Sequence, residues 1–213
     1  IAHQVRNPLS SINHAGQLLA ESPSIAEADK RLTEIIHNNS IRVNEIIESI
    51  LQLSKRQSSI RKPLVLADWL NRFINEFRQQ ENIDREKFTH IKPNNIDDLQ
   101  VMADPLQLNQ ILGNLCGNAI RHFNGNPDSL HIEIRSGINS QQECTLDIID
   151  NGPGFPTESR EQLFEPFFTT RSDGTGLGLY IAKELSDANG IELSMIPSNN
   201  GAHFRLRFTS NKG

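Results

Sequence analysis

The sequence predicts two domains of different fold class, a helical hairpin over residues 1–57 and an α/β sandwich over residues 64–213. Three observations support this division. The first part carries apolar residues at helical spacing with almost no strand pattern. A polar, basic stretch that ends in Pro63 then follows, and we assign residues 58–63 as a linker. After it, helical stripes alternate with short runs that are typical of strands.

Two amphipathic helices are expected in the first domain. One stripe starts with Val5, Leu9 and Ile12, and the run of Glu, Ser and Pro at 21–24 interrupts it. A second stripe continues at i, i+3, i+4 and i+7 spacing. Its residues are Leu32, Ile35, Ile36, Val43, Ile46, Ile47, Ile50, Leu51 and Leu53. Because a two-helix hairpin buries such a stripe poorly by itself, we expect a homodimer in which two hairpins form a four-helix bundle.

The second domain is expected to mix helices and strands. Asp68 is a candidate N-cap for a helix that carries Trp69 and Phe77. Asp104 followed by Pro105 is typical of a helix start, and this helix should run to about residue 122. The remaining expected elements, in order, are strands over 88–91 and 99–103, paired strands over 130–138 and 144–149, a glycine-rich region over 151–178, a helix over 177–188 and two closing strands around the turn at 199–201.

Composition excludes several classes of function. The chain has 26 acidic and 21 basic residues, a formal charge of −5, which argues against a nucleic-acid binder. Two cysteines, Cys116 and Cys144, are too few for a zinc site or a disulfide framework. No apolar run approaches the ~20 residues that span a bilayer. Because Ile1 has no methionine or cap before it, we expect a cytoplasmic fragment of a longer protein; an upstream sensor and an inner-membrane anchor stay open.

Asp150, Gly152 and Gly154 stand where a strand ends and a loop begins. A carboxylate there can accept a hydrogen bond from an exocyclic amine, and the glycines let backbone approach a ligand closely. An ordinary strand-to-loop turn is the competing interpretation.

A second glycine-rich run comprises Gly174, Thr175, Gly176, Leu177 and Gly178. It precedes a helix, and the free N–H groups of a helix N-terminus suit phosphate. The run matches neither the P-loop nor the dinucleotide pattern. A flexible loop that happens to be rich in glycine would have the same composition.

Asn114 and Asn118 lie four residues apart on one helix, so they share a face. Amides on an apolar face are costly unless a ligand or a metal-bound phosphate satisfies them. A capped or solvent-facing pair would also explain the spacing. Arg121 follows and could meet phosphate or simply the helix dipole. Phenylalanines at 164, 167 and 168 fit either a lid over a ligand or the plain core.

The order of these motifs resembles the catalytic and ATP-binding domain of two-component sensor histidine kinases, with the family's N, G1, F and G2 boxes in sequence. Residues 2–9 resemble that family's H-box, the phospho-accepting segment of the dimerisation hairpin. The segments 7–10 and 163–170 are similar to those of nitrogen-regulator and type IV pilus-regulator sensor kinases. The resemblance covers essentially the whole chain and implies a Bergerat-type sandwich for the second domain.

The resemblance also implies roles for individual residues. His3 would accept the γ-phosphoryl group of ATP, and Asp150 would bind the adenine amine. Asn118 would coordinate Mg²⁺, and Asn114 would help at the phosphates. Further nucleotide-binding positions would be Arg121, Gly152, Gly154, Phe164, Phe168, Arg171, Gly174, Thr175, Gly176, Leu177 and Gly178. The six other histidines are expected to be structural or superficial: His14, His37, His90, His122, His131 and His203.

The position after the phospho-accepting histidine departs from the family. It is usually acidic and in this chain is Gln4, whose amide can orient the imidazole but cannot act as a base. We therefore expect slower autophosphorylation than a Gln4→Glu variant would show. Asn7 lies one turn after His3, at the position that in the family aligns a water for dephosphorylating the partner. Phosphatase activity is accordingly a parallel hypothesis.

Three competing functions stay open at this point. An ATPase of the gyrase and Hsp90 group would need a Glu where this chain has Asn114. Intact ATP-binding boxes argue against a catalytically weak dimeric scaffold, but Gln4 and the start of the chain at Ile1 keep it open. A phosphatase-dominant protein is the third alternative. The expected partner is a response-regulator receiver domain, with a nitrogen-regulator-like transcription activator as one candidate. It would dock near His3, Asn7, Ser10 and Ser11 and the facing part of the second helix.

Overall fold

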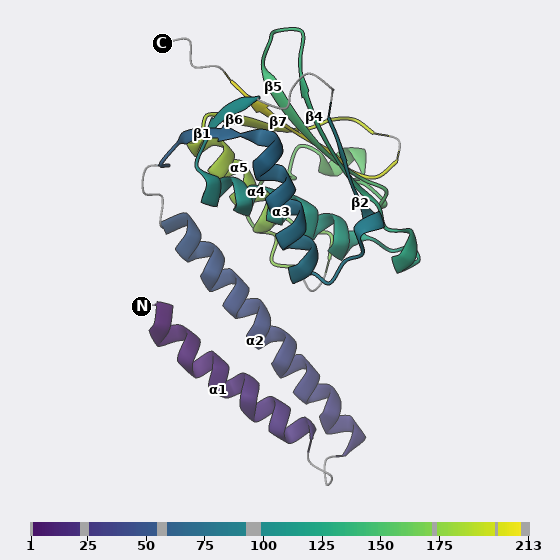
Figure 1. Cartoon of the computed structure of the whole chain (residues 1–213). Coiled ribbons are helices and arrows are strands. Elements are labelled where there is room, and N and C mark those ends of the chain that lie inside the picture. Colours follow the sequence, from purple (N-terminus) through teal and green to yellow (C-terminus); the bar gives the residue numbers. More distant parts are fainter. Residues whose placement is uncertain are drawn as a thin grey trace. The chain divides into compact units, whose positions relative to one another are not determined.

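The computed structural model describes residues 2–21, 26–54, 59–92, 99–171, 174–198 and 200–209. The chain divides into two compact units. The first comprises residues 1–56 and 165–177, and the second comprises residues 57–164 and 178–213. Figure 1 shows a helical hairpin followed by layers of helix and sheet, which confirms the predicted fold class. Within the described residues, no helix combines the length and the apolar character needed to cross a bilayer.

The hairpin consists of α1 (Ala2–Ala20) and α2 (Glu27–Ser54), which pack against each other. Polar and small residues occupy their contact. Thr33 and Ser40 are each only 4% exposed, and Nδ1 of His37 lies 2.5 Å from Oδ1 of Asn13. At Gly16 the helices approach so closely that an added Cβ would lie 3.3 Å from Ile36.

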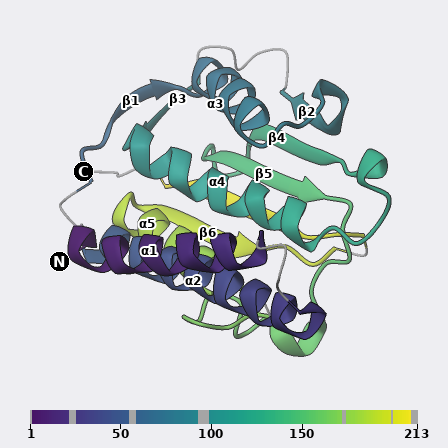
Figure 2. The same cartoon turned by 90° about the horizontal axis from the view of Figure 1, so that it is seen from below.

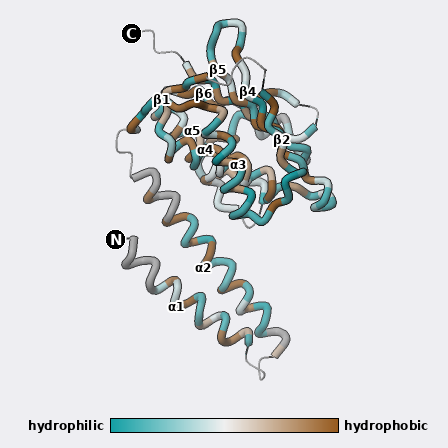
Figure 3. Tube along the Cα trace, in the orientation of Figure 1, coloured by the Kyte–Doolittle hydropathy of each residue, from teal (hydrophilic) through white to brown (hydrophobic). Residues whose placement is uncertain are grey.

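Part of the apolar stripe of α2 stays exposed outside this contact, although Ile36 approaches Gly16. Leu32, Ile35 and Val43 are 57%, 47% and 40% exposed in the single chain. In Figure 3 the apolar positions of α2 recur between hydrophilic ones along the helix. A hairpin that exposes its apolar stripe agrees with the expectation that two helices cannot bury it alone.

The second unit contains two sheets and three helices among its described residues. The helices are α3 (Leu66–Gln80), α4 (Pro105–His122) and α5 (Gly178–Ala188). The strands are β1 (Lys62–Val65), β2 (Phe88–Ile91), β3 (Gln100–Ala103), β4 (Ile132–Ile138), β5 (Cys144–Asp150), β6 (Ile191–Met195) and β7 (His203–Phe208). Short 3-10 turns lie at Arg85–Lys87, Pro127–Ser129 and Thr157–Ser159.

The larger sheet has the strand order β2-β4-β5-β7-β6 in the described chain. The pair β2–β4 is parallel and the other pairs are antiparallel. Figures 1 and 2 show α3, α4 and α5 on one face of this sheet. Leu146 of β5 and Leu206 of β7, in the middle of the sheet, are fully buried. Each buried leucine contributes about 1.5–3 kcal/mol through removal from water.

Several predicted elements are confirmed. Asp104 caps α4, because its Oδ1 accepts from the backbone N–H of Leu106 at 2.9 Å and of Gln107 at 3.3 Å. The strands β4 and β5 pair with Ile132 opposite Asp150, and β6 pairs with β7 across the predicted turn. Asn199 in that turn lies outside the described residues.

Two details differ from the prediction. The N-cap of α3 is Val65, so the assignment of Asp68 as cap is wrong; Asp68 lies in the first turn, where its charge favours the helix dipole. The strand β1 also begins inside the expected linker and pairs antiparallel with β3. The cause is non-local in both cases, since the N–H of Leu66 donates to the carbonyl of Leu99 and this contact fixes where strand becomes helix.

Candidate functional site

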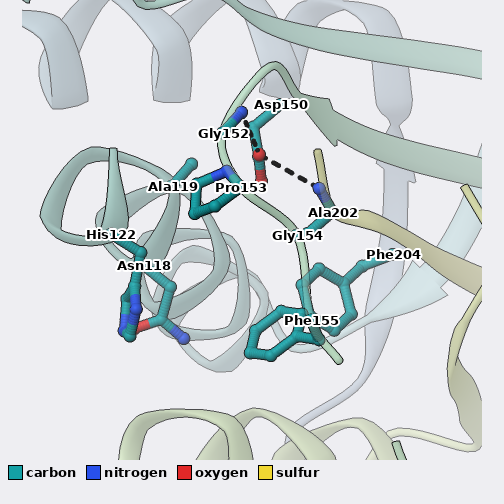
Figure 4. Close-up of a pocket in the computed structure, with 10 residues that line it drawn as sticks. All are labelled: Asn118, Ala119, His122, Asp150, Gly152, Pro153, Gly154, Phe155, Ala202 and Phe204. Carbon is teal, nitrogen blue, oxygen red and sulfur yellow. Dashed lines mark hydrogen bonds between the residues drawn. The ribbon is translucent and has the colours of Figure 1, made fainter. Parts of the chain in front are cut away.

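A small pocket lies at the end of β5 in the second unit. Figure 4 shows side chains from α4, from the loop after β5 and from β7 converging on it. Its lining residues are Asn118, Ala119, His122, Asp150, Gly152, Pro153, Gly154, Phe155, Ala202 and Phe204. The structure therefore brings the predicted residues Asn118, Asp150, Gly152 and Gly154 together.

Asp150 is held by backbone groups on one side of its carboxylate. Oδ1 accepts from the N–H of Gly152 at 2.8 Å and from that of Ala202 at 3.0 Å, as the dashed lines of Figure 4 mark. No bond to Oδ2 accompanies them in the described chain, so this oxygen can accept from a ligand. Burial raises the pKa of the Asp150 carboxyl, although both N–H bonds and the nearby His122 act in the opposite direction.

Glycine backbone makes this arrangement possible. Gly154 and Gly201 have φ of +67° and +69°, in the left-handed region that favours glycine. A Cβ on Gly154 would lie 2.8 Å from the carbonyl oxygen of Gly201, and a Cβ on Gly201 would overlap the carbonyl group of Asp150. Sequence reasoning assigned Gly201 only to a turn; nothing in the sequence indicated that it packs on Asp150.

The amides of α4 meet the first residue of α5. A Cβ on Gly178 would lie 3.8 Å from Oδ1 of Asn114 and 3.8 Å from Oδ1 of Asn118. Nδ2 of Asn114 is buried and has no hydrogen-bond partner in the described chain. An unmade bond of this kind costs about 1–3 kcal/mol, and a ligand oxygen would remove that cost.

Arg121 lies beside the second amide. Its Nη2 donates to Oδ1 of Asn118 at 3.1 Å. A Cβ on Gly117 would come within 3.1 Å of Nη1 of Arg121, so Gly117 leaves room for the guanidinium. Sequence reasoning did not identify this role of Gly117, for which four-residue spacing to Arg121 was the available signal.

Aromatic side chains form one wall of the pocket. The rings of Phe155 and Phe204 lie 6.0 Å apart, and that of Phe164 lies 6.4 Å from Phe204, both edge to face. The ring of His122 lies 6.4 Å from Phe155. His122, expected to be structural or superficial, thus also lines the pocket. Phe155 and Phe204 were missed, although the position of Phe155 directly after Gly154 was a usable signal.

Residues 165–177 belong to the first unit, and hydrogen bonds and glycine backbone shape the part of this segment that the structure describes. The N–H of Phe167 donates to the carbonyl of Gly176 at 3.0 Å. Phe167 and Gly176 have φ of +67° and +68°, and a Cβ on Gly176 would lie 2.6 Å from the carbonyl oxygen of Phe167. A Cβ on Gly174 would similarly meet Oγ1 of Thr169. The glycines thus serve the geometry of the turn itself.

The remaining predicted residues of this turn differ in exposure. Leu177 is buried, Phe168 and Thr175 are half-buried, and Arg171 is exposed. Their expected role at the phosphates stays a prediction. His3, Gln4 and Asn7 lie in the first two turns of α1, where the side chains are outside the described part of the structure. Their roles also stay predictions.

The donor set suits a magnesium ion only together with phosphate. Among the described residues, no group of three or more His, Cys, Asp or Glu side chains could hold a metal. The amide oxygens of Asn114 and Asn118 are hard ligands, and Mg²⁺ commonly takes one or two protein oxygens besides waters and substrate phosphates. Neither cysteine lines the pocket, and burial raises the pKa of both thiols, Cys116 and Cys144.

Comparison with protein families gives two matches. Residues 1–59 match the His Kinase A (phospho-acceptor) domain. Residues 103–212 match the histidine kinase-, DNA gyrase B- and HSP90-like ATPase family. The two matches cover the hairpin and most of the second unit.

Individual proteins agree with these families. Sensor protein kinase PilS of Pseudomonas aeruginosa is 39% identical over 98% of this chain and 39% of its own length. Sensory histidine kinase/phosphatase NtrB of Rhodobacter capsulatus is 29% identical over 89% of this chain and 55% of its own length. Histidine kinase ThkA in complex with response regulator protein TrrA superposes with a TM-score of 0.68 at 28% identity, over 100% of this chain and 61% of that one.

The chain thus spans well under two thirds of these curated relatives. Within that span the phospho-acceptor domain comes first and the ATPase domain follows it. The chain belongs to the two-component sensor histidine kinase family.

Proposed function

We propose that this chain is a histidine kinase core that transfers the γ-phosphoryl group of ATP to His3. One observation carries the proposal: a single pocket joins Asp150 of β5 to Asn118 of α4, in a chain whose first 59 residues match a phospho-acceptor domain. We retain the domain limits 1–57, 58–63 and 64–213 as part of the proposal.

In this pocket the adenine amine donates to Oδ2 of Asp150, and the aromatic wall of Phe155 and Phe204 covers the base. Asn114 and Asn118 lie at the phosphate end, where Asn118 would hold Mg²⁺ and the unpartnered Nδ2 of Asn114 would donate to a phosphate oxygen. Bound Mg²⁺ supplies neutralisation of phosphate charge. Arg121 adds positive charge at the same end, which suits a reaction that depends on positioning and electrostatics.

The transfer itself is an in-line displacement. A nitrogen of neutral His3 forms the new bond to the γ-phosphorus, the bond from that phosphorus to the β,γ-bridging oxygen breaks, and ADP leaves. Gln4 can hold the imidazole by a hydrogen bond but takes no proton, so the proton passes to solvent. The phosphoryl group then moves to an aspartate of a receiver domain.

Partners follow from the hairpin. The exposed stripe of Leu32, Ile35 and Val43 supports a homodimer, in which two hairpins bury this surface as a four-helix bundle. The complex of ThkA with TrrA supports a response-regulator partner. A nitrogen-regulator-like activator is the finer proposal. The greater length of the sensor relatives supports a longer protein, and we propose that this chain is its cytoplasmic part and that the whole is anchored in the inner membrane.

The test is incubation with Mg²⁺ and γ-labelled ATP, with His3→Ala beside wild type and His14→Ala as the matched control on the same helix. We expect label that is acid-labile and alkali-stable, lost in His3→Ala and kept in His14→Ala. An unlabelled wild-type chain that still binds ATP would contradict kinase activity.

A second activity has support from the name of NtrB, a kinase/phosphatase. We propose that Asn7, one turn after His3, positions water for dephosphorylation of the receiver domain. Loss of phosphatase activity in Asn7→Ala with kinase activity kept is the expected result. A gyrase-type hydrolase is disfavoured because Asn114 replaces the required base.

A further inference from the structure

Asn189 joins two helices at the end of α5. It is only 2% exposed and uses its whole side chain. Oδ1 accepts from the backbone N–H of Asp104 at 2.7 Å, while Nδ2 donates to Oε1 of Gln107 at 2.6 Å and to the carbonyl of Leu185 at 2.8 Å. The C-terminus of α5 is thereby bonded to the first turn of α4, and nothing in the proposed chemistry uses this contact.

Residues 59–61, which follow α2 in the sequence, form hydrogen bonds with the start of α4 and the end of α5. The N–H of Ile60 donates to Oδ2 of Asp104 at 2.9 Å, whose Oδ1 already caps α4. Oγ of Ser59 donates to the carbonyl of Ala188 at 2.8 Å. One carboxylate therefore serves both the linker and the helix.

Arg61 adds a third bond from the linker. Its Nη1 donates to the carbonyl of Asn189 at 3.3 Å and lies where a Cβ on Gly190 would approach to 3.1 Å. Gly190, with φ of +69°, both ends α5 and leaves space for this side chain. We call the set the linker junction; it consists of Ser59, Ile60, Arg61, Asp104, Gln107, Ala188 and Asn189.

The opposite ends of the same two helices form the proposed phosphate end of the site. Gly178 begins α5 beside Asn114 and Asn118 of α4. The helix α5 has 11 residues and so spans about 16 Å between the two ends. Between them the helices pack closely through residues such as Ile111 and Ile181, both 2% exposed or less. A close-packed pair of this kind transmits a displacement at one end to the other.

We propose that the linker junction is coupled to the nucleotide site, with Asn189 as the positioning residue that connects them. Bonding of residues 59–61 fixes the spacing of α4 and α5, and so the spacing of Asn118 and Gly178. By linkage, nucleotide must in turn strengthen the bonds of the linker. This inference rests on the nucleotide site of the proposed function.

A proline substitution tests the bond with little loss of packing. Ile60 is 76% exposed, and Ile60→Pro removes the N–H that Asp104 accepts, whereas Ile60→Ala retains it. We expect Ile60→Pro to weaken binding of a non-hydrolysable ATP analogue about fivefold, at the low end of usual coupling between sites, and Ile60→Ala to match wild type. Asn189→Ala is a poorer test, because it leaves buried groups of Asp104 and Gln107 unpaired and can prevent folding.

The reciprocal effect separates coupling from a merely structural role. Amide exchange of Ile60 and Asp104, followed by NMR on the full chain, should slow about fivefold when the analogue saturates the site. The inference would be overturned if Ile60→Pro and Ile60→Ala bound the ATP analogue with equal affinity. An amide exchange rate at Ile60 that is the same with and without the analogue would also overturn it. If wild type binds no analogue at all, the proposed function fails first, so the two failures are distinguishable.

Discussion

Asp150→Asn should separate stability from nucleotide binding. Burial raises the pKa of the Asp150 carboxyl, so the charged form is unfavourable in the folded state. In the amide variant, Oδ1 must remain the acceptor for the N–H groups of Gly152 and Ala202. The amide NH₂ group then takes the place of Oδ2, where a donor would face the adenine amine, itself a donor.

Asp150→Asn should weaken ATP binding but should not lower the stability of the fold. Loss of a hydrogen bond to a charged acceptor costs about 1.5–3 kcal/mol, which corresponds to roughly 10- to 150-fold weaker ATP binding. Stability should be unchanged or higher at pH 7. Because the native pKa is raised, folded Asp150 holds its proton more tightly than Asp150 in the unfolded chain does. Its contribution to the free energy of unfolding therefore falls as the pH rises from the ordinary pKa to the raised native pKa. Any gain from Asp150→Asn should therefore shrink as the pH falls through the raised native pKa of Asp150 towards its ordinary value.

Asp147→Asn is the matched control, three residues earlier on β5. Asp147 lies outside the pocket and bonds Arg205 at 2.7 Å and His203 at 2.6 Å. Removing its charge should lower the free energy of unfolding by about 2 kcal/mol, less than for a fully buried pair because Arg205 is 39% exposed. ATP affinity should not change. Calorimetric titration and thermal unfolding measure both quantities; equal ATP affinities of Asp150→Asn and wild type would refute the role of Oδ2.

Three further outcomes are expected. Gln4→Glu, which supplies a base beside His3, should autophosphorylate at least about tenfold faster than wild type, whereas Gln4→Ala should not; equal initial rates of label incorporation would contradict this reasoning. Ile35→Asp places a charge in the exposed stripe of α2 and should give a monomer in light scattering, with Glu34→Gln as a dimeric control; a dimer in both would show that another surface pairs. Gly201→Ala adds a Cβ that overlaps the carbonyl of Asp150 at φ +69°, and should cost about 3 kcal/mol of unfolding free energy, while Gly137→Ala, at 3.6 Å from Thr145, should cost little in chemical denaturation.

Local signals allowed much of the second unit to be predicted. Asp104 and Pro105 identify the start of α4 because a side-chain cap and a fixed φ act within one turn. Strand β4 was recognisable because its buried and less buried residues alternate, whereas β5 is buried on both faces over Cys144–Ile148. The proposed nucleotide-binding roles of Asp150, Asn114 and Asn118 come from motif order, which depends on sequence alone.

Contacts between distant segments were not predictable. β1 needs β3 beside it, and α3 begins at Leu66 because of a bond to Leu99. His122 and Phe204 look like ordinary helix and strand residues until the loop after β5 turns between them. Gly201 reads as a turn residue, and only the structure places it against Asp150. In each case the partner lies far away in the sequence, so periodicity carries no information about it.

The hairpin illustrates how burial can oppose hydropathy. Its internal contact holds Thr33, Ser40 and the pair of His37 with Asn13. Leu32, Ile35 and Val43 of the apolar stripe stay exposed. A contact between polar side chains adds little to the stability of the hairpin, because the hydrogen bonds made on folding replace hydrogen bonds to water. A second copy that covers Ile35 and Val43 would therefore provide most of the stabilisation of this domain. The α1–α2 contact of a single chain is then weak by itself. Folding of the hairpin should therefore depend on protein concentration.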